Sequence, residues 1–94
     1  MDLPYIAFCK YCAENGLVRF WRCNSCGTVL GVCDECESGW KNIEALFKDN
    51  ELDSEFVVTE KCPICGNDTC DGKFMISKDV EELHLGDFIK GVSP

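Results

Sequence analysis

The chain has 94 residues and nine cysteines, and its formal net charge is −8 at pH 7. This length is typical of one domain, which we expect to span residues 1–94. No apolar run approaches the roughly 20 residues of a membrane span, and the acidic balance argues against a nucleic-acid-binding protein, which needs clustered Lys and Arg.

Eight of the nine cysteines form four Cys-x-x-Cys pairs. In chain order the pairs are Cys9 and Cys12, Cys23 and Cys26, Cys33 and Cys36, and Cys62 and Cys65. Two intervening residues let both sulfurs of a pair point at one ion, and zinc prefers four such ligands at roughly 2.3 Å. Four pairs therefore predict two structural Zn²⁺ ions. Because a chain of this size has a thin apolar core, we expect the metal-free protein to be largely unfolded.

The Cys-x-x-Cys spacing also suits three other uses of cysteine. A disulfide framework is disfavoured by the odd cysteine count and by the opening MDLPYIAFCK, which lacks the features of an export signal. We therefore expect the protein to be located in the cytoplasm or in another reducing intracellular compartment. A redox motif explains one Cys-x-x-Cys pair better than it explains four. The second and fourth pairs, each followed by glycine, also resemble the iron-binding knuckles of rubredoxin.

The first half of the chain is expected to form a hairpin and then the main helix. Residues 17–22 (LVRFWR) and 28–32 (TVLGV) have strand character and flank the second pair, which places this pair at a hairpin tip. Gly27 suits the left-handed backbone of such a turn. Apolar residues at helical spacing, Trp40 among them, predict a helix over about 35–49. The third pair would then lie at the start of this helix.

The second half is expected to form another hairpin and a short helix. Residues 56–60 (FVVTE) and 73–77 (KFMIS) have strand character and flank the fourth pair, which would lie at or near the second hairpin tip. A C-terminal helix around 78–85 would bury Val80 and Leu83. The predicted fold class is a small zinc-stabilised α+β domain with two β-hairpins that carry zinc knuckles, one main helix and one short helix.

Hairpin geometry favours an interleaved pairing of the metal ligands. A hairpin over 17–32 returns the chain to its start, which brings the third pair near the first and leaves the second pair to meet the fourth. Site 1 would take Cys9, Cys12, Cys33 and Cys36, and site 2 would take Cys23, Cys26, Cys62 and Cys65. The six residues between the second and third pairs span roughly 20 Å when extended, which disfavours a shared ion. Joining the first pair to the second stays open.

These features resemble known double-zinc modules over about residues 9–65. A knuckle, a hairpin and a Cys-x-x-Cys at a helix start resemble a treble clef, and two facing knuckles are similar to a zinc ribbon. The spacing CxxC-x10-CxxC-x6-CxxC-x25-CxxC and the interleaved sites resemble a cross-braced, all-cysteine RING module. The gap of six residues departs from that pattern. The RING resemblance implies ubiquitin ligase activity, with Trp40, Pro63 and Ile64 forming a groove for a conjugating enzyme.

Cys70 and His84 lie outside the pattern of pairs. Cys70, in the segment NDTCDG, is interpreted as a free loop thiol. Alternatively, Cys70 takes the place of one metal ligand of the fourth pair, or it is a reactive thiol. A catalytic cysteine needs a base partner, and nothing in the sequence places the lone His84 near it. Asp68 and Asp71 disfavour a thiolate between them.

Basic residues gather only at Lys10, Arg19 and Arg22. The run Arg19-Phe20-Trp21-Arg22 could stack on a base. A strand with a packed aromatic residue and solvated arginines explains the same run without a ligand. Nucleic acid is therefore disfavoured as a partner.

The function class that these observations favour is a protein-interaction module. Two four-thiolate sites leave no open position for water, and no catalytic motif is apparent, so an enzyme is disfavoured. An acidic face would meet a protein partner, as in an inhibitor or immunity protein for a basic target. The expected contacts are Glu44, Asp49, Glu51, Asp53, Glu55 and the segment 79–90. A RING-like ligase module and a rubredoxin-like electron carrier are the alternatives, and simple solvation explains the same charges.

Overall fold

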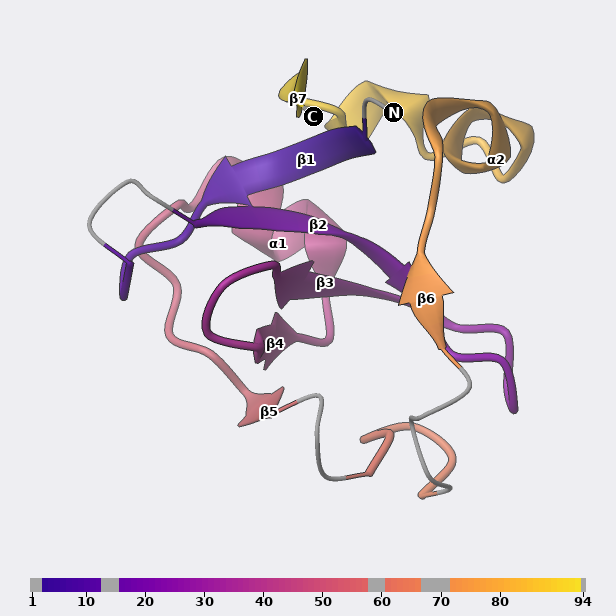
Figure 1. Cartoon of the computed structure of the whole chain (residues 1–94), viewed down its shortest axis with the longest axis horizontal. Coiled ribbons are helices and arrows are strands. Elements are labelled where there is room, and N and C mark those ends of the chain that lie inside the picture. Colours follow the sequence, from indigo (N-terminus) through magenta and orange to yellow (C-terminus); the bar gives the residue numbers. More distant parts are fainter. Residues whose placement is uncertain (1–2, 13–15, 58–60, 67–71, 94) are drawn as a thin grey trace.

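The structure is a computed structural model that describes residues 3–12, 16–57, 61–66 and 72–93. Its strands are β1 Leu3–Phe8, β2 Leu17–Arg22, β3 Val29–Cys33, β4 Ser38–Trp40, β5 Phe56–Val57, β6 Lys73–Phe74 and β7 Gly91–Ser93. Its helices are α1 Ile43–Lys48, α2 Ser77–Glu82 and the 3-10 turn η1 Gly86–Phe88. Within these residues the strands form one antiparallel sheet in the order β5-β4-β3-β2-β1-β7, with β6 beside the end of β2 (Figure 1).

Strands β1 to β4 form a meander in which each turn leads directly to the neighbouring strand (Figure 1). Strand β2 pairs along its length with β3, and its other edge pairs with β1 and β6. This confirms the predicted hairpin, with the second strand shifted by one residue. In a meander, every second turn lies at the same end of the sheet, so the β1–β2 and β3–β4 turns lie at one end and the β2–β3 turn at the other. The first and third cysteine pairs therefore share one end, and the second pair lies at the other.

The main helix is shorter than predicted. It begins at Ile43 and not near residue 35, because the chain first turns at residues 34–36 and returns as β4, which pairs with β3. Asn42 caps α1 by accepting a hydrogen bond of 3.1 Å from the amide of Ala45. The third cysteine pair thus lies at a hairpin tip, so the expected treble-clef arrangement does not form there.

The expected second hairpin is also replaced by other pairings. Among the described residues, β5 pairs with β4 and β6 pairs with β2, and residues 58–60 of the predicted strand lie outside the described part. Helix α2 confirms the short C-terminal helix and the burial of Val80. The prediction that Leu83 is buried is wrong, since its side chain is 39% exposed. The helix ends at Glu82, and Leu85 packs against the core instead.

Both faces of the sheet are covered. Phe20 and Trp21 are consecutive in β2, so they point to opposite faces, and both are buried. The face of Phe20 packs against α1 and the C-terminal segment in the larger apolar cluster, which includes Leu46 and Val80. The face of Trp21 packs in a smaller cluster with Leu30, Val32, Cys23 and Cys62. The fourth cysteine pair therefore covers the face opposite the main core.

Arg19 is buried, which corrects the expectation of a solvated side chain. Its exposed fraction is 3%, and its Nε donates to Asp34 Oδ2 at 2.7 Å. Its Nη1 donates to the carbonyl oxygens of Leu3 and Ser93, at 2.8 and 3.1 Å. The guanidinium thus ties β1 and β7 to the middle of the sheet and is not placed to stack on a base. No helix of the described residues has the length and apolar character needed to cross a bilayer.

Candidate metal centres

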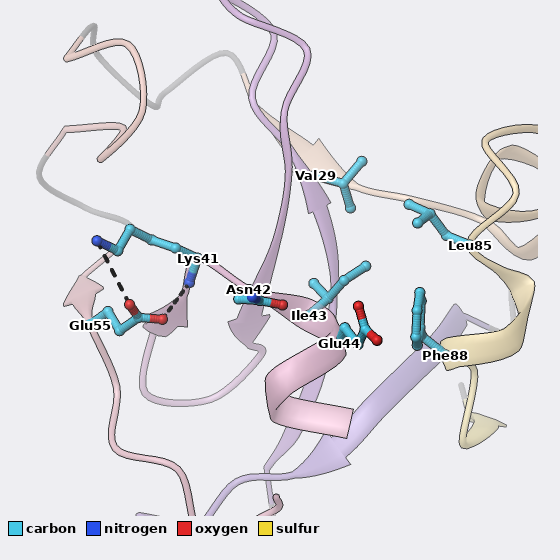
Figure 2. A pocket seen from close by; sticks show the side chains of 8 residues that line it. All are labelled: Val29, Lys41, Asn42, Ile43, Glu44, Glu55, Leu85 and Phe88. Atoms are coloured by element: carbon cyan, nitrogen blue, oxygen red, sulfur yellow. Dashed lines mark hydrogen bonds and ion pairs between the residues drawn. The ribbon is translucent and has the colours of Figure 1, made fainter. Parts of the chain in front are cut away.

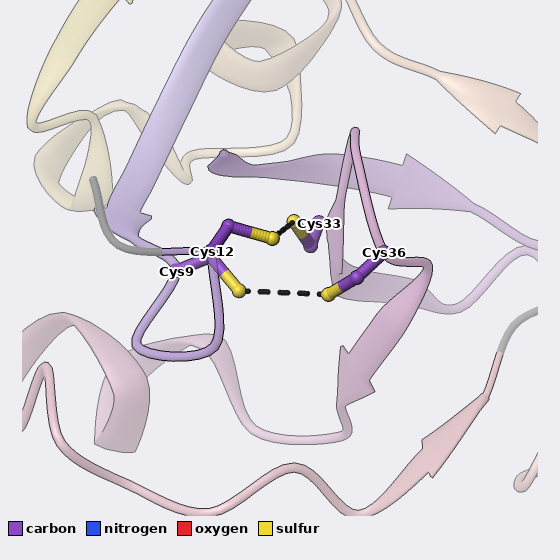
Figure 3. Close-up of side chains that lie close together, drawn as sticks. All are labelled: Cys9, Cys12, Cys33 and Cys36. Carbon is purple, nitrogen blue, oxygen red and sulfur yellow. Dashed lines mark hydrogen bonds between the residues drawn. The ribbon is translucent and has the colours of Figure 1, made fainter. Parts of the chain in front are cut away.

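Site 1 lies where the β1–β2 turn meets the β3–β4 turn (Figure 3). The Sγ atoms of Cys9 and Cys36 lie 3.6 Å apart, and those of Cys12 and Cys33 lie 3.7 Å apart. All four sulfurs lie within 4.8 Å of one another. A tetrahedron with metal–sulfur bonds of about 2.3 Å has edges of about 3.8 Å. The quartet therefore has the size of a tetrathiolate metal site.

Site 2 lies at the β2–β3 turn, at the opposite end of the sheet. The Sγ atoms of Cys23 and Cys65 lie 3.8 Å apart, as do those of Cys26 and Cys62. These four sulfurs also lie within 4.8 Å of one another. The sulfurs gather in the interleaved grouping that hairpin geometry favoured, and the first pair does not join the second. The meander gives the reason, because it keeps the first and second turns at opposite ends.

The donor set fits a thiophilic ion and not a disulfide framework. The described cysteines are unbonded to one another, and the closest sulfurs are 3.6 to 3.8 Å apart, well beyond the roughly 2.05 Å of a sulfur–sulfur bond. Each sulfur of a quartet approaches the others without a carboxylate or imidazole among them. Zinc and iron both accept four thiolates in this geometry, whereas calcium and magnesium prefer oxygen.

A hydroxyl group supports one exposed sulfur of each site. Cys26 Sγ is hydrogen-bonded to Thr28 Oγ1 at 3.3 Å, and Cys36 Sγ to Ser38 Oγ at 3.2 Å. Hydrogen bonds from the hydroxyl and the amide of Thr28 lower the pKa of Cys26 to about 6. Burial raises the pKa of Cys36, but hydrogen bonds with Ser38, Cys12 and Cys33 together outweigh burial and bring the pKa to about 7. Both favour thiolate, the form that binds metal. The shared spacing of Cys-x-Thr and Cys-x-Ser is a sequence signal for these positions that the sequence interpretation missed.

Two other cysteines of site 1, the half-buried Cys12 and the buried Cys33, have raised pKa values. Burial raises the pKa of Cys12 to about 11, and burial also raises the pKa of Cys33. Cys33 lies in the larger apolar cluster together with Cys9. A dication beside such groups reverses this preference, because it stabilises the thiolate directly. A bound metal ion would therefore change the charge of Cys12 and Cys33.

Three of the cysteine turns share a left-handed backbone conformation at the same position. The residue after the second cysteine has positive φ in each, at +74° for Gly27, +63° for Glu37 and +75° for Gly66. The amides of Gly27 and Gly66 donate to the carbonyl oxygens of Cys23 and Cys62, at 2.7 and 2.9 Å. Glycine adopts this backbone without strain, whereas a side chain costs roughly 1–2 kcal/mol. Glu37 is the one strained member of the three.

Substitutions at two of these turns are expected to differ in their effect on stability. Gly66→Ala should destabilise the metal-loaded protein by about 1 kcal/mol, and the cost is purely conformational because a Cβ there meets nothing within 4 Å. Glu37→Gly should not destabilise it, since relief of strain offsets the greater entropy of glycine in the unfolded chain. The midpoints of urea unfolding measure both effects. Equal loss of stability in the two variants would contradict this account.

Gly16 lies directly against site 1 and was not singled out from the sequence. A Cβ at this position would lie 2.8 Å from Cys33 Sγ and 3.0 Å from Cys12 Sγ. Gly16→Ala is therefore expected to weaken metal binding at site 1 by at least about tenfold and to cost about 1–3 kcal/mol of stability. Competition with a chromogenic chelator measures the affinity. Gly86→Ala is the control, because its Cβ would make only a 3.4 Å contact with Glu81. Unchanged affinity in Gly16→Ala would show that the sulfurs can move aside.

Of the remaining sequence candidates, those in the described part of the chain do not join either site. Cys70 lies outside the described residues. His84 is exposed, has a φ of +61° and belongs to neither quartet. Trp40 is 1% exposed, donates its indole N–H to the Leu52 carbonyl at 2.8 Å and stacks on Tyr11. It cannot form the surface groove that the RING resemblance implied, because the ring is inside the fold.

Comparison of the chain with models of protein families, with curated proteins and with solved structures found no match. The interpretation of the two sites therefore depends on their own geometry. That geometry is a small α+β fold in which two quartets of cysteine could hold metal ions. The two cysteine quartets among the described residues suggest a structural metal-binding module.

Proposed function

We propose that this protein is a protein-interaction module whose scaffold is held by two structural Zn²⁺ ions. The observation that carries the proposal is the pair of sulfur quartets at opposite ends of one sheet. Four sulfurs fill all the positions of a tetrahedral ion, which leaves none for a reacting water or a substrate. Two such ions serve to hold turns together, and the surface is left to carry the function.

Each ion would join two cysteine pairs that are distant in the sequence. Cys9, Cys12, Cys33 and Cys36 would hold one zinc, and Cys23, Cys26, Cys62 and Cys65 would hold the other. Zinc supplies no redox chemistry and acts by fixing the positions of its ligands. Eight thiolates and two dications would take the formal charge from −8 to about −12 with Cys70 protonated. The loaded protein is therefore strongly acidic.

The acidic surface is uneven. Three of the carboxylates expected to meet a partner are already in ion pairs, namely Glu44 with Lys48, Asp53 with Lys10 and Glu55 with Lys41. The C-terminal segment offers Asp79, Glu81, Glu82 and Asp87, all exposed and without an ion pair to another described residue. A basic protein partner would complement this surface, as an enzyme with a cationic active site complements an inhibitor or immunity protein.

Salt dependence tests the proposed interaction. The zinc-loaded protein would be cross-linked in the cells that make it, its partners identified by mass spectrometry, and the Kd of each purified partner measured between about 50 and 500 mM NaCl. Binding to a basic partner should weaken by at least about tenfold over this range, because salt screens charges at an exposed interface. Salt-independent binding by every partner would contradict the proposal.

A further inference from the structure

An open groove of about 680 Å³ lies between β3 and α1 on one side and the C-terminal segment on the other (Figure 2). Its apolar walls are the side chains of Val29, Ile43, Leu85 and Phe88, which face a common space. Val29, Leu85 and Phe88 are half-buried, so part of each remains open to solvent. The groove thus combines partly exposed apolar side chains with polar and charged ones.

The walls are anchored to the main core. Ile43 belongs to the larger apolar cluster, and Val29, Leu85 and Phe88 pack against that cluster. The ring of Phe88 meets the ring of Phe47 edge to face, with the centroids 5.8 Å apart. Side chains fixed in this way lose little freedom when a ligand arrives, which favours binding of an apolar group.

The rim of the groove is charged. The side chain of Glu44 lies across from Phe88, and Glu55 lies further along beside Lys41 (Figure 2). Glu44 is held by an exposed ion pair to Lys48. Glu55 is held by an ion pair to Lys41 and accepts a hydrogen bond of 2.9 Å from the Lys41 amide. Such pairs contribute little in water, so a cation of a partner can replace the lysine at small cost.

Charge around the groove selects the kind of partner. The two flanking segments, 41–55 and 77–90, carry nine carboxylates and four lysines between them. An approaching basic chain is therefore attracted and an acidic one repelled. An apolar side chain alone would gain nothing from this field, and a cation alone would leave the apolar walls uncovered.

We propose that this groove binds a segment of a basic partner protein, with one large apolar side chain against Val29, Leu85 and Phe88 and a neighbouring Arg or Lys paired with Glu44. This inference rests on the proposed function and assigns its contact surface. It also separates the acidic residues by role, because Glu44 would touch the partner while Glu82, which does not line the groove, would act only at long range.

Synthetic peptides test the required chemistry on the zinc-loaded full chain. One peptide carries a central leucine between arginines, a second carries glycine in place of the leucine, and a third carries glutamates in place of the arginines. Only the first should bind measurably, with amide shift changes in two-dimensional NMR centred on residues 29, 43, 85 and 88. Equal binding of the first two peptides, or shift changes centred elsewhere, would overturn the proposal.

Two charge reversals locate the contact. Glu44→Lys should weaken binding of the first peptide at least fivefold, whereas Glu82→Lys, which makes the same change of net charge, should weaken it no more than twofold. Equal losses would mean a diffuse acidic surface, which overturns the groove and leaves the proposed function standing. If NMR places the first peptide in the groove but its Kd does not change with salt, the proposed ion pair with Glu44 and the electrostatic attraction of the proposed function would both be contradicted.

A second copy of this chain is the competing occupant. Sedimentation equilibrium of the zinc-loaded protein should show a monomer at concentrations where the first peptide binds. A dimer that dissociates in Glu44→Lys would place another copy of the chain in the groove and overturn the proposal.

Discussion

Cys33→Ser is expected to unfold most of the chain. Its sulfur is fully buried in the larger apolar cluster and lies 3.7 Å from that of Cys12. A structural zinc contributes an apparent 10–16 kcal/mol or so, which is comparable to the whole stability of a small domain, about 5–15 kcal/mol. Serine is similar in size, so the loss reflects the ligand and not a cavity. Circular dichroism and NMR should show loss of the β1–β4 sheet.

Cys70→Ser is the matched control for this variant. The sequence interpretation treats Cys70 as a thiol outside both sites, so its replacement should leave metal content and the unfolding midpoint nearly unchanged. A folded Cys33→Ser protein with native spectra would contradict the account of site 1. So would a Cys70→Ser protein that loses metal.

Cys62→Ser is expected to release the fourth cysteine pair while leaving the main core folded. Cys62 lies in the smaller apolar cluster, and its flanking strands β5 and β6 contain two residues each. In the described part of the chain, residues 61–66 belong to no helix or strand and only Lys61 takes part in an isolated β-bridge, so we expect site 2 to provide most of what holds them against the sheet. The variant should keep one equivalent of metal, and hydrogen exchange should stay slow in β2 and β3 and become fast in β5.

Tryptophan fluorescence separates this variant from Cys33→Ser. Trp21 packs with Cys62 in the smaller cluster, whereas Trp40 lies in the larger one. The emission of Trp21 should therefore shift to the red in Cys62→Ser, and that of Trp40 should not, as single Trp→Phe backgrounds would show. Red shifts of both tryptophans would mean that the two sites fold as one unit and would overturn the distinction between them.

The features that could be predicted from the sequence have local signals. The strand LVRFWR, the turn at Gly27 and the four Cys-x-x-Cys pairs are contiguous in the chain. The grouping of the sulfurs followed from one topological step, because a hairpin returns the chain to its start and leaves its tip at the far end. The start of the main helix was missed because Trp40 and Ile43 also fit a helical spacing, while Asn42 was the better boundary signal.

The features that could not be predicted depend on contacts distant in the chain. Strands of two residues, such as β5 and β6, have too few positions for a periodic pattern. The pairing of β1 with β7 joins the two ends of the described chain, and the sequence interpretation assigned neither strand. Arg19 is buried because Asp34 and the carbonyl oxygens of Leu3 and Ser93 converge on it. No pattern around residue 19 indicates those partners.

The metal content of natively purified protein tests the central claim most directly. Elemental analysis by mass spectrometry, together with the protein concentration, should give two equivalents of zinc per chain and no iron. Fewer than two equivalents of metal in folded protein, or iron in place of zinc, would contradict the account.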